Sequence, residues 1–247
     1  MAVAALSVLL ETRGLSRSFS GLRAVHEVDF TLPEGQIRAL IGPNGAGKTT
    51  FVSMLVGRLA PSSGTVLFDG RDVTGLPVHA RVRLGMAYTF QITSVFQRLS
   101  LHENVALAAR RRLGGESRAV ERTVREALSR VGLLEQARRN AEELSYGHQR
   151  LLEIAMGIAQ KPRLLILDEP TQGLADGEIA DFKALLGELA CETTILLIEH
   201  NMSVVMEVAE KITVLNSGEV LAEGSPEEIH ADPRVQAAYL GVPDAAG

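Results

Sequence analysis

The chain of 247 residues has no tryptophan and one cysteine, Cys191. A single cysteine cannot form a disulfide within the chain, so a reducing compartment is expected. No apolar run reaches the ~18 consecutive residues that a membrane-spanning helix needs. Any action at a membrane would therefore require another subunit as the anchor. The apolar N-terminus has no basic residues ahead of it and is expected to lead into a first strand rather than to act as a signal peptide.

Positive charge is also limited, because 25 lysine and arginine residues stand against 30 aspartate and glutamate residues, and the net charge is −5. An acidic chain is a poor candidate for binding the phosphate backbone of a nucleic acid, so no nucleic-acid partner is expected. The remaining balance is that of an ordinary globular protein, with 46% hydrophobic and 22% charged residues. A chain of this length can form a sizeable core in one large domain or two small ones.

The most informative segment is GPNGAGKTT at residues 42–50, which fits the phosphate-loop pattern G-x-x-x-x-G-K-[ST]. An apolar run at residues 37–41 precedes it and a helix-compatible stretch at residues 49–59 follows, which is the strand–loop–helix context that the motif requires. Glycines let backbone N–H groups turn inward around phosphate oxygens, and the following helix directs its positive dipole end at the same anion. The candidate nucleotide-binding residues are Gly42, Pro43, Asn44, Gly45, Ala46, Gly47, Lys48, Thr49 and Thr50.

Two side chains of this segment carry specific chemistry. Lys48 supplies a positive charge for the outer phosphates of ATP, and the Thr49 hydroxyl is a suitable ligand for Mg²⁺. A glycine-rich turn that only caps a helix is the alternative interpretation. Lysine is rare in this chain, with four residues in all, so a lysine at the required position favours the nucleotide site. We therefore expect the protein to bind ATP and Mg²⁺.

Polar groups suited to ATP chemistry follow two further apolar runs. Residues 164–167 lead into Asp168 and Glu169, and residues 193–198 lead into Glu199 and His200. Continuous apolar runs on either side of a helical stretch indicate parallel strands that are buried on both faces. Because ligands bind beyond the carboxyl ends of such strands, these groups and the phosphate loop are expected to meet in one site.

The chemistry of each group suggests a role. Asp168, at a strand end, can hold Mg²⁺ together with Thr49. Glu169, expected on the opposite side of the pleat, can polarise the water that attacks the terminal phosphate of ATP. His200 can donate a hydrogen bond to that phosphate. A capped strand exit and a partly buried histidine are the alternative interpretations of the acid pair and of His200.

Further strands and helices are expected around this α/β core. The sequence predicts short strands at residues 8–13, 28–32 and 64–70, a helix at residues 176–189 and a hairpin at residues 211–222. Apolar residues at helical spacing predict three more helices, at residues 101–113, 119–131 and 149–160. Residues 92–160 are therefore a candidate helical subdomain, inserted in a core that is discontinuous in sequence.

Residues 144–147 read LSYG, which resembles the LSGGQ signature of the ATP-binding cassette ATPases. The order of the motifs is also similar to that of the family: phosphate loop, Gln91 within TFQ, signature, acidic strand end, and His200. The resemblance covers nearly the whole chain, as a single ATPase domain of residues 1–247. It implies a P-loop NTPase core of the RecA-like type, with an antiparallel β subdomain and an inserted α-helical subdomain at residues 92–160.

The resemblance implies roles for four residues around a nucleotide bound to the same chain. Phe19 resembles the aromatic residue that stacks on adenine, with a core phenylalanine as the alternative. Gln91 resembles the glutamine that senses Mg²⁺ and links the core to the helical insert. Glu169 would be the catalytic base, and His200 would be the switch histidine.

The signature segment is implied to act across a dimer. Ser145 and Gly147 precede the third of the predicted helices, whose free N–H groups form a second anion site, and they would cap the ATP of a second subunit. The chain departs from the family pattern at three positions. Tyr146 replaces a glycine, His148 stands where glutamine is common, and Ala175 stands where aspartate or asparagine is expected in the segment after Glu169. The departure at Ala175 lies in a segment that, in the family, contacts the second subunit of the dimer.

Several segments resemble the ATPase subunits of polar and branched-chain amino-acid importers: LSYG, LEIA, IEHNMSVVMEVA and the terminal AYLG. LPVHARVRLG and SVFQRLS also resemble the lipopolysaccharide-export ATPase, but the first set favours import. The implied partners are a second ATPase subunit, identical or similar, transmembrane permease subunits that contact the helical insert and residues 92–100, and indirectly a periplasmic solute-binding protein. The implied location is peripheral, on the cytoplasmic face of the inner membrane.

Three other functions compete with transport. A soluble cassette ATPase of DNA repair or translation usually carries a coiled-coil insert or a second fused cassette, and this sequence has neither. A phosphate-loop kinase would leave the LSYG segment and the acid pair unexplained. A purely structural nucleotide-binding subunit is the third, but the base and the Mg²⁺ ligand are present, so we expect ATP hydrolysis despite Ala175.

Overall fold

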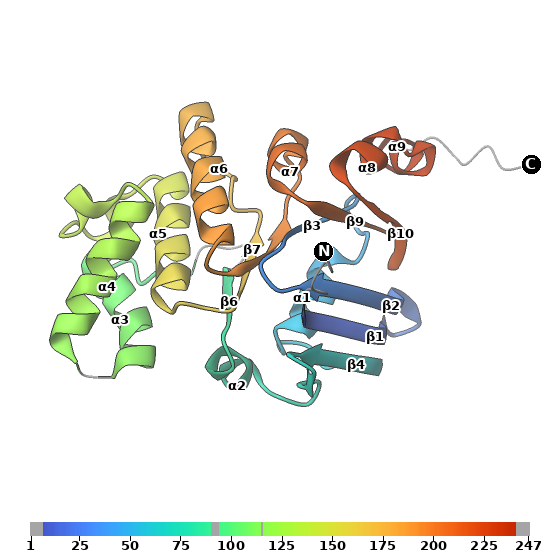
Figure 1. Ribbon diagram of the computed structural model, residues 1–247, viewed down its shortest axis with the longest axis horizontal. Coiled ribbons are helices and arrows are strands. Elements are labelled where there is room, and N and C mark those ends of the chain that lie inside the picture. The colour runs from blue at the N-terminus through green and yellow to red at the C-terminus, as the bar shows by residue number, and fades with distance from the viewer. Residues whose placement is uncertain (1–6, 90–93, 115, 241–247) are drawn as a thin grey trace, which may run out of the picture.

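The computed structural model describes residues 7–89, 94–114 and 116–240. An α/β core lies between an antiparallel sheet and a group of helices at the opposite end of the molecule (Figure 1). Among the described helices, none combines the length and the apolar character that crossing a bilayer requires.

Six strands form the central sheet, in the order β10-β9-β3-β8-β7-β6. All neighbours in it are parallel except β10, which pairs antiparallel with β9. The predicted parallel strands and the predicted hairpin are therefore confirmed. The strands are β3 (Ile37–Ile41), β6 (Met86–Thr89), β7 (Leu164–Asp168), β8 (Thr194–Ile198), β9 (Lys211–Asn216) and β10 (Glu219–Gly224).

The middle strands are buried on both faces, as their continuous apolar sequences predict. In β7, Leu165 and Leu167 belong to the apolar cluster that includes α5 (Tyr146–Ala159) and α6 (Asp176–Ala190). Leu164 and Ile166 belong to a second cluster, which includes α1 (Lys48–Leu55) and the antiparallel sheet. The apolar residues on both faces fix the strand, and the polar residues that follow it emerge at the edge where β3 and β8 also end.

The antiparallel sheet has the strand order β2-β1-β4-β5. Its two long strands extend beyond the predicted segments at residues 8–13 and 28–32, because register shifts and Gly14, with φ of 54°, interrupt the alternation of apolar residues in β1. The strands are β1 (Val8–Phe19), β2 (Leu22–Pro33), β4 (Ser63–Phe68) and β5 (Arg71–Asp72).

Three helices lie together at one end of the molecule (Figure 1): α3 (Leu101–Leu113), α4 (Ser117–Arg130) and α5. One apolar cluster runs from Val105 and Val124 through Leu152 to Leu165 in the sheet. The helices therefore share the core of the sheet rather than enclosing a separate one. The division at residues 92–160 stays a prediction.

Most predicted helices are present, with shifted ends. The first helix, α1, ends at Leu55 rather than at residue 59, because Gly57 adopts a left-handed conformation with φ of 80° just after it. The sequence analysis did not predict β6 or several short helices. The remaining helices are α2 (Val78–Arg83), η1 (Leu134–Gln136), η2 (Ala141–Glu143), α7 (Met202–Val208), α8 (Pro226–Ala231) and α9 (Pro233–Leu240).

Candidate functional site

The loop between β3 and α1 needs glycine at both ends. Gly42 and Gly47 have φ of 151° and 99°, values that residues with a side chain rarely adopt. A Cβ on Gly42 would lie 2.1 Å from the carbonyl oxygen of Leu215, and one on Gly47 would lie 2.4 Å from that of Ala24. The loop is therefore pressed against its neighbours on one side, and its other side lines an open cleft.

This cleft has a volume of about 450 Å³ and lies at the carboxyl ends of the parallel strands. It brings the loop together with the acid pair and the histidine, as the sequence predicts, and Leu22 and Arg23 of the antiparallel sheet also line it. Ser145 and Gly147 do not line it. The groups that face it from the core include Asn44, Lys48, Thr49, Asp168, Glu169 and His200.

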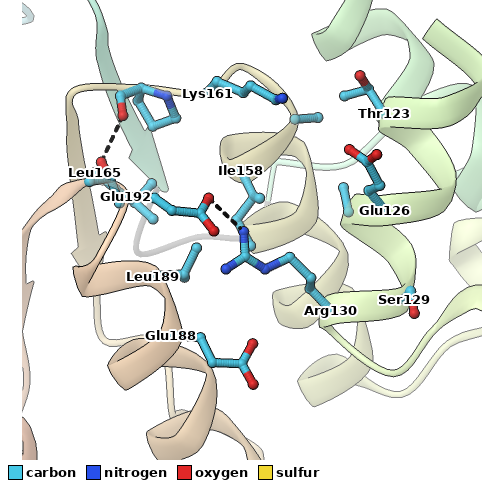
Figure 2. Close-up of a pocket in the computed structure, with 14 residues that line it drawn as sticks. Thr123, Glu126, Ser129, Arg130, Ile158, Lys161, Leu165, Glu188, Leu189 and Glu192 are labelled. Carbon is cyan, nitrogen blue, oxygen red and sulfur yellow. Dashed lines mark hydrogen bonds and ion pairs between the residues drawn. The ribbon is translucent and has the colours of Figure 1, made fainter. Parts of the chain in front are cut away.

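A larger cavity, of about 810 Å³, lies between α4, α5 and α6 (Figure 2). An ion pair of 3.0 Å between Arg130 Nη1 and Glu192 Oε2 joins two of its walls. Glu126, Glu188 and Glu192 outnumber the basic lining groups, Arg130 and Lys161. This acidic lining and the absence of a glycine loop among its lining residues make it unsuitable for a polyphosphate, and the smaller cleft is the candidate site.

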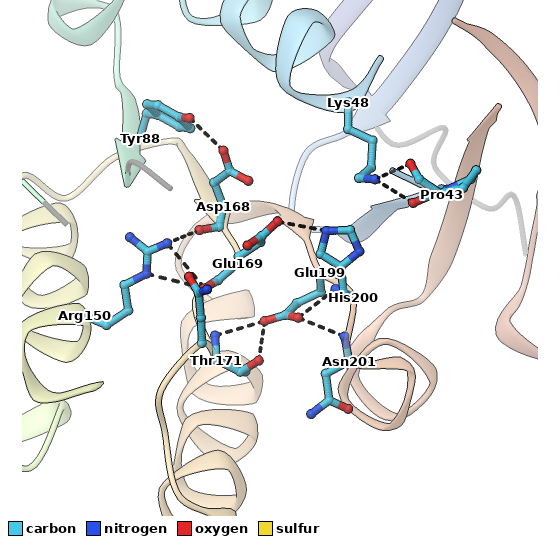
Figure 3. Close-up of polar contacts among 12 residues, drawn as sticks. Pro43, Lys48, Tyr88, Arg150, Asp168, Glu169, Thr171, Glu199, His200 and Asn201 are labelled. Carbon is cyan, nitrogen blue, oxygen red and sulfur yellow. Dashed lines mark hydrogen bonds and ion pairs between the residues drawn. The ribbon is translucent and has the colours of Figure 1, made fainter. Parts of the chain in front are cut away.

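Lys48 is the cation that the phosphate loop contributes to the cleft, and its side chain bends back onto the loop (Figure 3). Its ammonium Nζ donates hydrogen bonds to the carbonyl oxygens of Gly42 at 2.5 Å and Pro43 at 3.0 Å. Burial lowers the pKa of Lys48, while the charges of Glu169 and Asp168 act in the opposite direction. The ammonium is thus held between the loop and the two acids.

Asp168 is the last residue of β7 and is only 2% exposed. The Tyr88 hydroxyl, from the neighbouring strand β6, donates a hydrogen bond of 2.8 Å to its Oδ2. Burial raises the pKa of Asp168, and the hydrogen bond from Tyr88 opposes that shift. Sequence analysis missed Tyr88, because it lies 80 positions away and reaches Asp168 only through the pairing of β6 with β7.

Glu169 leaves the strand through a left-handed turn. Its φ is 50°, and its backbone N–H donates to the carbonyl oxygen of Ile198 in β8 at 2.8 Å. The expectation that Glu169 sits on the opposite side of the pleat is wrong, because β7 ends one residue earlier. The turn brings Glu169 Oε1 to 2.8 Å from Nε2 of His200 (Figure 3). A left-handed conformation is strained for glutamate and persists only where its surroundings hold it.

The buried Arg150 of α5 holds this turn through hydrogen bonds to its backbone. Its guanidinium donates hydrogen bonds to the carbonyl oxygens of Asp168 and of Glu169, the latter at 3.3 Å. It also donates to Glu153 Oε2 at 2.8 Å, within the same helix. A fully buried guanidinium needs such partners, so Arg150 is tied to the backbone next to the acid pair. Nothing in the sequence pattern singled it out.

Glu199, which is 3% exposed, connects the two segments that carry Glu169 and His200. Its carboxylate accepts hydrogen bonds from the Thr171 backbone N–H and hydroxyl, at 2.9 and 2.5 Å. It also accepts from the backbone N–H groups of His200 and Asn201, at 2.9 and 3.1 Å. The sequence marked Glu199 as an acid at a strand end, but not as a link between two loops.

Other predicted site residues have mixed outcomes. Phe19 is 42% exposed, so the core alternative is wrong, and the Arg17 guanidinium lies 4.7 Å above its ring; the contact with adenine stays a prediction. Gln91 lies outside the described residues. The helix after the signature begins at Tyr146 rather than at residue 149, because the Ser145 hydroxyl accepts the His148 N–H at 3.2 Å and caps it.

The donor atoms of the cleft fit Mg²⁺. Thr49 and Asp168 both line it and supply the hydroxyl and carboxylate oxygens that this ion prefers. In the described part of the chain, no three His, Cys, Asp or Glu side chains form a metal cluster. That is compatible with Mg²⁺, which usually keeps several waters and is held by one or two protein groups together with substrate phosphates.

Comparison with known proteins gives consistent results. A family model described as ABC transporter matches residues 25–172, and one described as Branched-chain amino acid ATP-binding cassette transporter matches residues 219–245. The high-affinity branched-chain amino acid transport ATP-binding protein BraF of Pseudomonas aeruginosa is 42% identical, over 94% of this chain and 98% of that protein. The lipopolysaccharide export system ATP-binding protein LptB of Acidithiobacillus ferridurans is 36% identical, over 96% and 98%.

A solved structure has the same fold. It is the ADP conformation of an ATP-binding cassette from an ABC transporter, and it superposes with a TM-score of 0.84. The two chains are 27% identical, over 95% of this chain and 99% of that one. The predicted P-loop NTPase fold of the cassette ATPases is therefore confirmed.

The close approach at Gly47 predicts the effect of a single methyl group. Gly47→Ala would meet the Ala24 carbonyl oxygen and force the loop to move. We expect ATP affinity to fall about tenfold or more, equivalent to ~1.4 kcal/mol or more, in a fluorescent-nucleotide titration. Gly187→Ala is the matched control, because that glycine lies inside α6 with open space around it. The control should bind ATP normally, and equal affinity of both variants would contradict the role of the close approach.

The raised pKa of Asp168 predicts that its ionisation lowers the stability of the fold. Because the pKa is higher in the folded than in the unfolded chain, ionisation of Asp168 opposes folding above its unfolded pKa of about 4. Asp168→Asn should therefore melt at a higher temperature than the wild type at pH 7 without ligands. This advantage should shrink as the pH falls from the folded toward the unfolded pKa. Calorimetry across pH 4–7 measures it, and a lower melting temperature of the variant at pH 7 would contradict the argument.

Proposed function

The chain belongs to the ABC transporter family of ATP-binding proteins, and on that premise we propose that it hydrolyses ATP to drive amino-acid import through a separate permease. The observation that carries the proposal is the cleft that unites the phosphate loop, Asp168 and the Glu169–His200 pair. No further cofactor is needed beyond Mg²⁺. The expected location is the cytoplasmic face of the inner membrane, with the permease as the anchor.

Branched-chain amino acids are the proposed cargo. Two observations support them: the 42% identity with BraF and the second family model, which matches residues 219–245. Lipopolysaccharide export is less well supported, because LptB is 36% identical. Cargo passes through the permease, so the cargo is inferred from relatives and not from this cleft.

The loop and α1 would bind the phosphates of ATP. The backbone N–H groups of the loop and the first turn of α1 supply donors and a positive dipole end. Lys48 would exchange its hydrogen bonds with the Gly42 and Pro43 carbonyl groups for the outer phosphates. The hydroxyl of Thr49 and the carboxylate of Asp168 would hold Mg²⁺, which when bound neutralises charge that develops on the phosphate oxygens.

Glu169 and His200 would carry the hydrolytic step. The Glu169 carboxylate accepts a proton from water as the water oxygen forms a bond to the terminal phosphorus, and the bond to the bridging oxygen of ADP breaks. His200, whose Nε2 lies 2.8 Å from Glu169, would orient this carboxylate and hydrogen-bond the phosphate. Arg150 and Glu199 do not line the cleft; they hold the two segments that carry this pair.

A second ATPase subunit would complete the site. Ser145 caps α5, and neither Ser145 nor Gly147 lines the cleft of its own chain. Together with Gly147, it would cap the ATP bound to the partner subunit. The permease would contact the helices at the other end, where Phe96 and Leu107 are exposed by 55% and 42%. A periplasmic solute-binding protein would deliver the amino acid to that permease.

Glu169→Gln tests the chemical step. The amide cannot accept the proton, so we expect phosphate release to fall by a factor of about 10²–10⁴ in the assembled complex, with ATP affinity unchanged. Free phosphate and bound nucleotide are the two measurements. Glu219→Gln, an exposed carboxylate in β10, is the matched control and should retain full turnover. A wild-type turnover no higher than that of Glu169→Gln would refute hydrolysis, and a phosphorylated small molecule in place of free phosphate would indicate a kinase.

Uptake in cells tests the cargo. In cells that lack the native copy, the wild-type chain should restore uptake of labelled leucine, isoleucine and valine. Lys48→Ala removes the ammonium that would bind the phosphates of ATP. Uptake should then stay at background, because ATP is no longer bound productively. Restored lipopolysaccharide at the cell surface without amino-acid uptake would replace import with export as the function.

A further inference from the structure

The first turn of α5 lies directly against the segment that follows Glu169. A Cβ on Gly147 would lie 2.5 Å from the carbonyl oxygen of Gly173, so the two backbones touch where no side chain fits. The Tyr146 ring covers Gly173, and its hydroxyl donates a hydrogen bond of 3.3 Å to Gln172 Oε1. The signature turn and the segment after Glu169 are therefore in contact within one subunit.

The same segment ends at a helix that lacks the usual side-chain cap. Ala175 is the N-cap residue of α6, a position that favours Ser, Thr, Asp or Asn, because their side-chain oxygens accept a free N–H of the first turn. The methyl group of Ala175 cannot do this. Glu178, three residues later, accepts the backbone N–H of Ala175 at 2.8 Å through Oε2, which is the other half of a capping box.

The other oxygen of this carboxylate belongs to a second contact. His148, in the first turn of α5, brings Nε2 to 2.7 Å from Glu178 Oε1. The backbone of His148 is fixed as well, because its N–H donates to the Ser145 hydroxyl that caps α5. Glu178 thus joins two helix N-termini, with one oxygen directed to each.

We propose that His148 and Glu178 form a positioning bridge between the N-termini of α5 and α6. The bridge holds residues 170–178 against the signature turn. Glu169 is coupled to that segment, since its carbonyl oxygen accepts the Gln172 N–H at 3.2 Å. This inference rests on the proposed roles of Glu169 and of the signature turn in ATP hydrolysis.

The bridge would act on turnover rather than on stability. Both side chains are about one-third exposed, and partly exposed ion pairs contribute little to global stability. Neither His148 nor Glu178 lines the cleft, so ATP binding to a single subunit should be unaffected. Misplacement of a catalytic group, in contrast, has large effects on rate.

A double-mutant cycle in the assembled complex tests the bridge. His148→Ala should lower kcat about fivefold and change KM for ATP less than twofold. This is the expected result when a catalytic group, here Glu169, is no longer held in position. Glu178→Ala removes the other partner of the bridge. In that background, His148→Ala should lower kcat less than twofold, because the bridge is already broken. His148→Gln keeps an N–H donor and should retain most of the wild-type kcat.

Lys183→Ala is the matched control, since it removes another partly exposed ion pair of α6, with Glu207 of α7. It should leave kcat unchanged in both backgrounds. Equal losses from His148→Ala with and without Glu178→Ala would overturn the bridge, as would wild-type turnover of His148→Ala. These outcomes presuppose an active wild type. A wild-type complex without ATPase activity would instead refute the proposed function itself.

Discussion

The left-handed backbone of Glu169 is the constraint around which the candidate site is organised. A glutamate with φ of 50° would relax into the strand unless other groups held it. Arg150 binds the carbonyl oxygens on either side of the turn, and Ile198 accepts its N–H. Glu199 ties the following loop to the segment of His200. Two fully or nearly buried charged side chains thus serve the geometry of one backbone turn, which directs the carboxylate toward His200 in the cleft.

The sheet and the cleft could be predicted because their signals are local. Apolar runs of strand length, each followed by a polar group, identify β3, β7 and β8, and their shared edge brings Lys48, Asp168 and His200 together. Tyr88 and Arg150 could not be predicted in this way. Each acts through a contact set by strand order or helix packing, and neither position carries a pattern of its own. The start of α5 was missed for a simpler reason: the Ser145 hydroxyl caps the helix earlier than the apolar spacing indicates.

The electrostatics of the cleft show a balance that favours function over stability. Burial raises the pKa of Asp168 and lowers that of Lys48, so burial disfavours the charged form of each group. The charges of Glu169 and Asp168 oppose the shift in the pKa of Lys48. The Tyr88 hydroxyl and the charge of Arg150 oppose the shift in the pKa of Asp168. Such unfavourable burial is typical of sites that are arranged to meet a charged ligand, because the ligand then supplies the missing partners.

The uninterrupted apolar cluster from α3 to β7 has a mechanical consequence. Close-packed side chains resist compression, so a push on α3 would reach β7 through α5 as elastic displacement instead of being absorbed by rearranging contacts. On the α4 side, the cavity of about 810 Å³ between α4, α5 and α6 interrupts this close packing (Figure 2). A displacement of α3 would therefore reach the strand that carries Asp168 through α5.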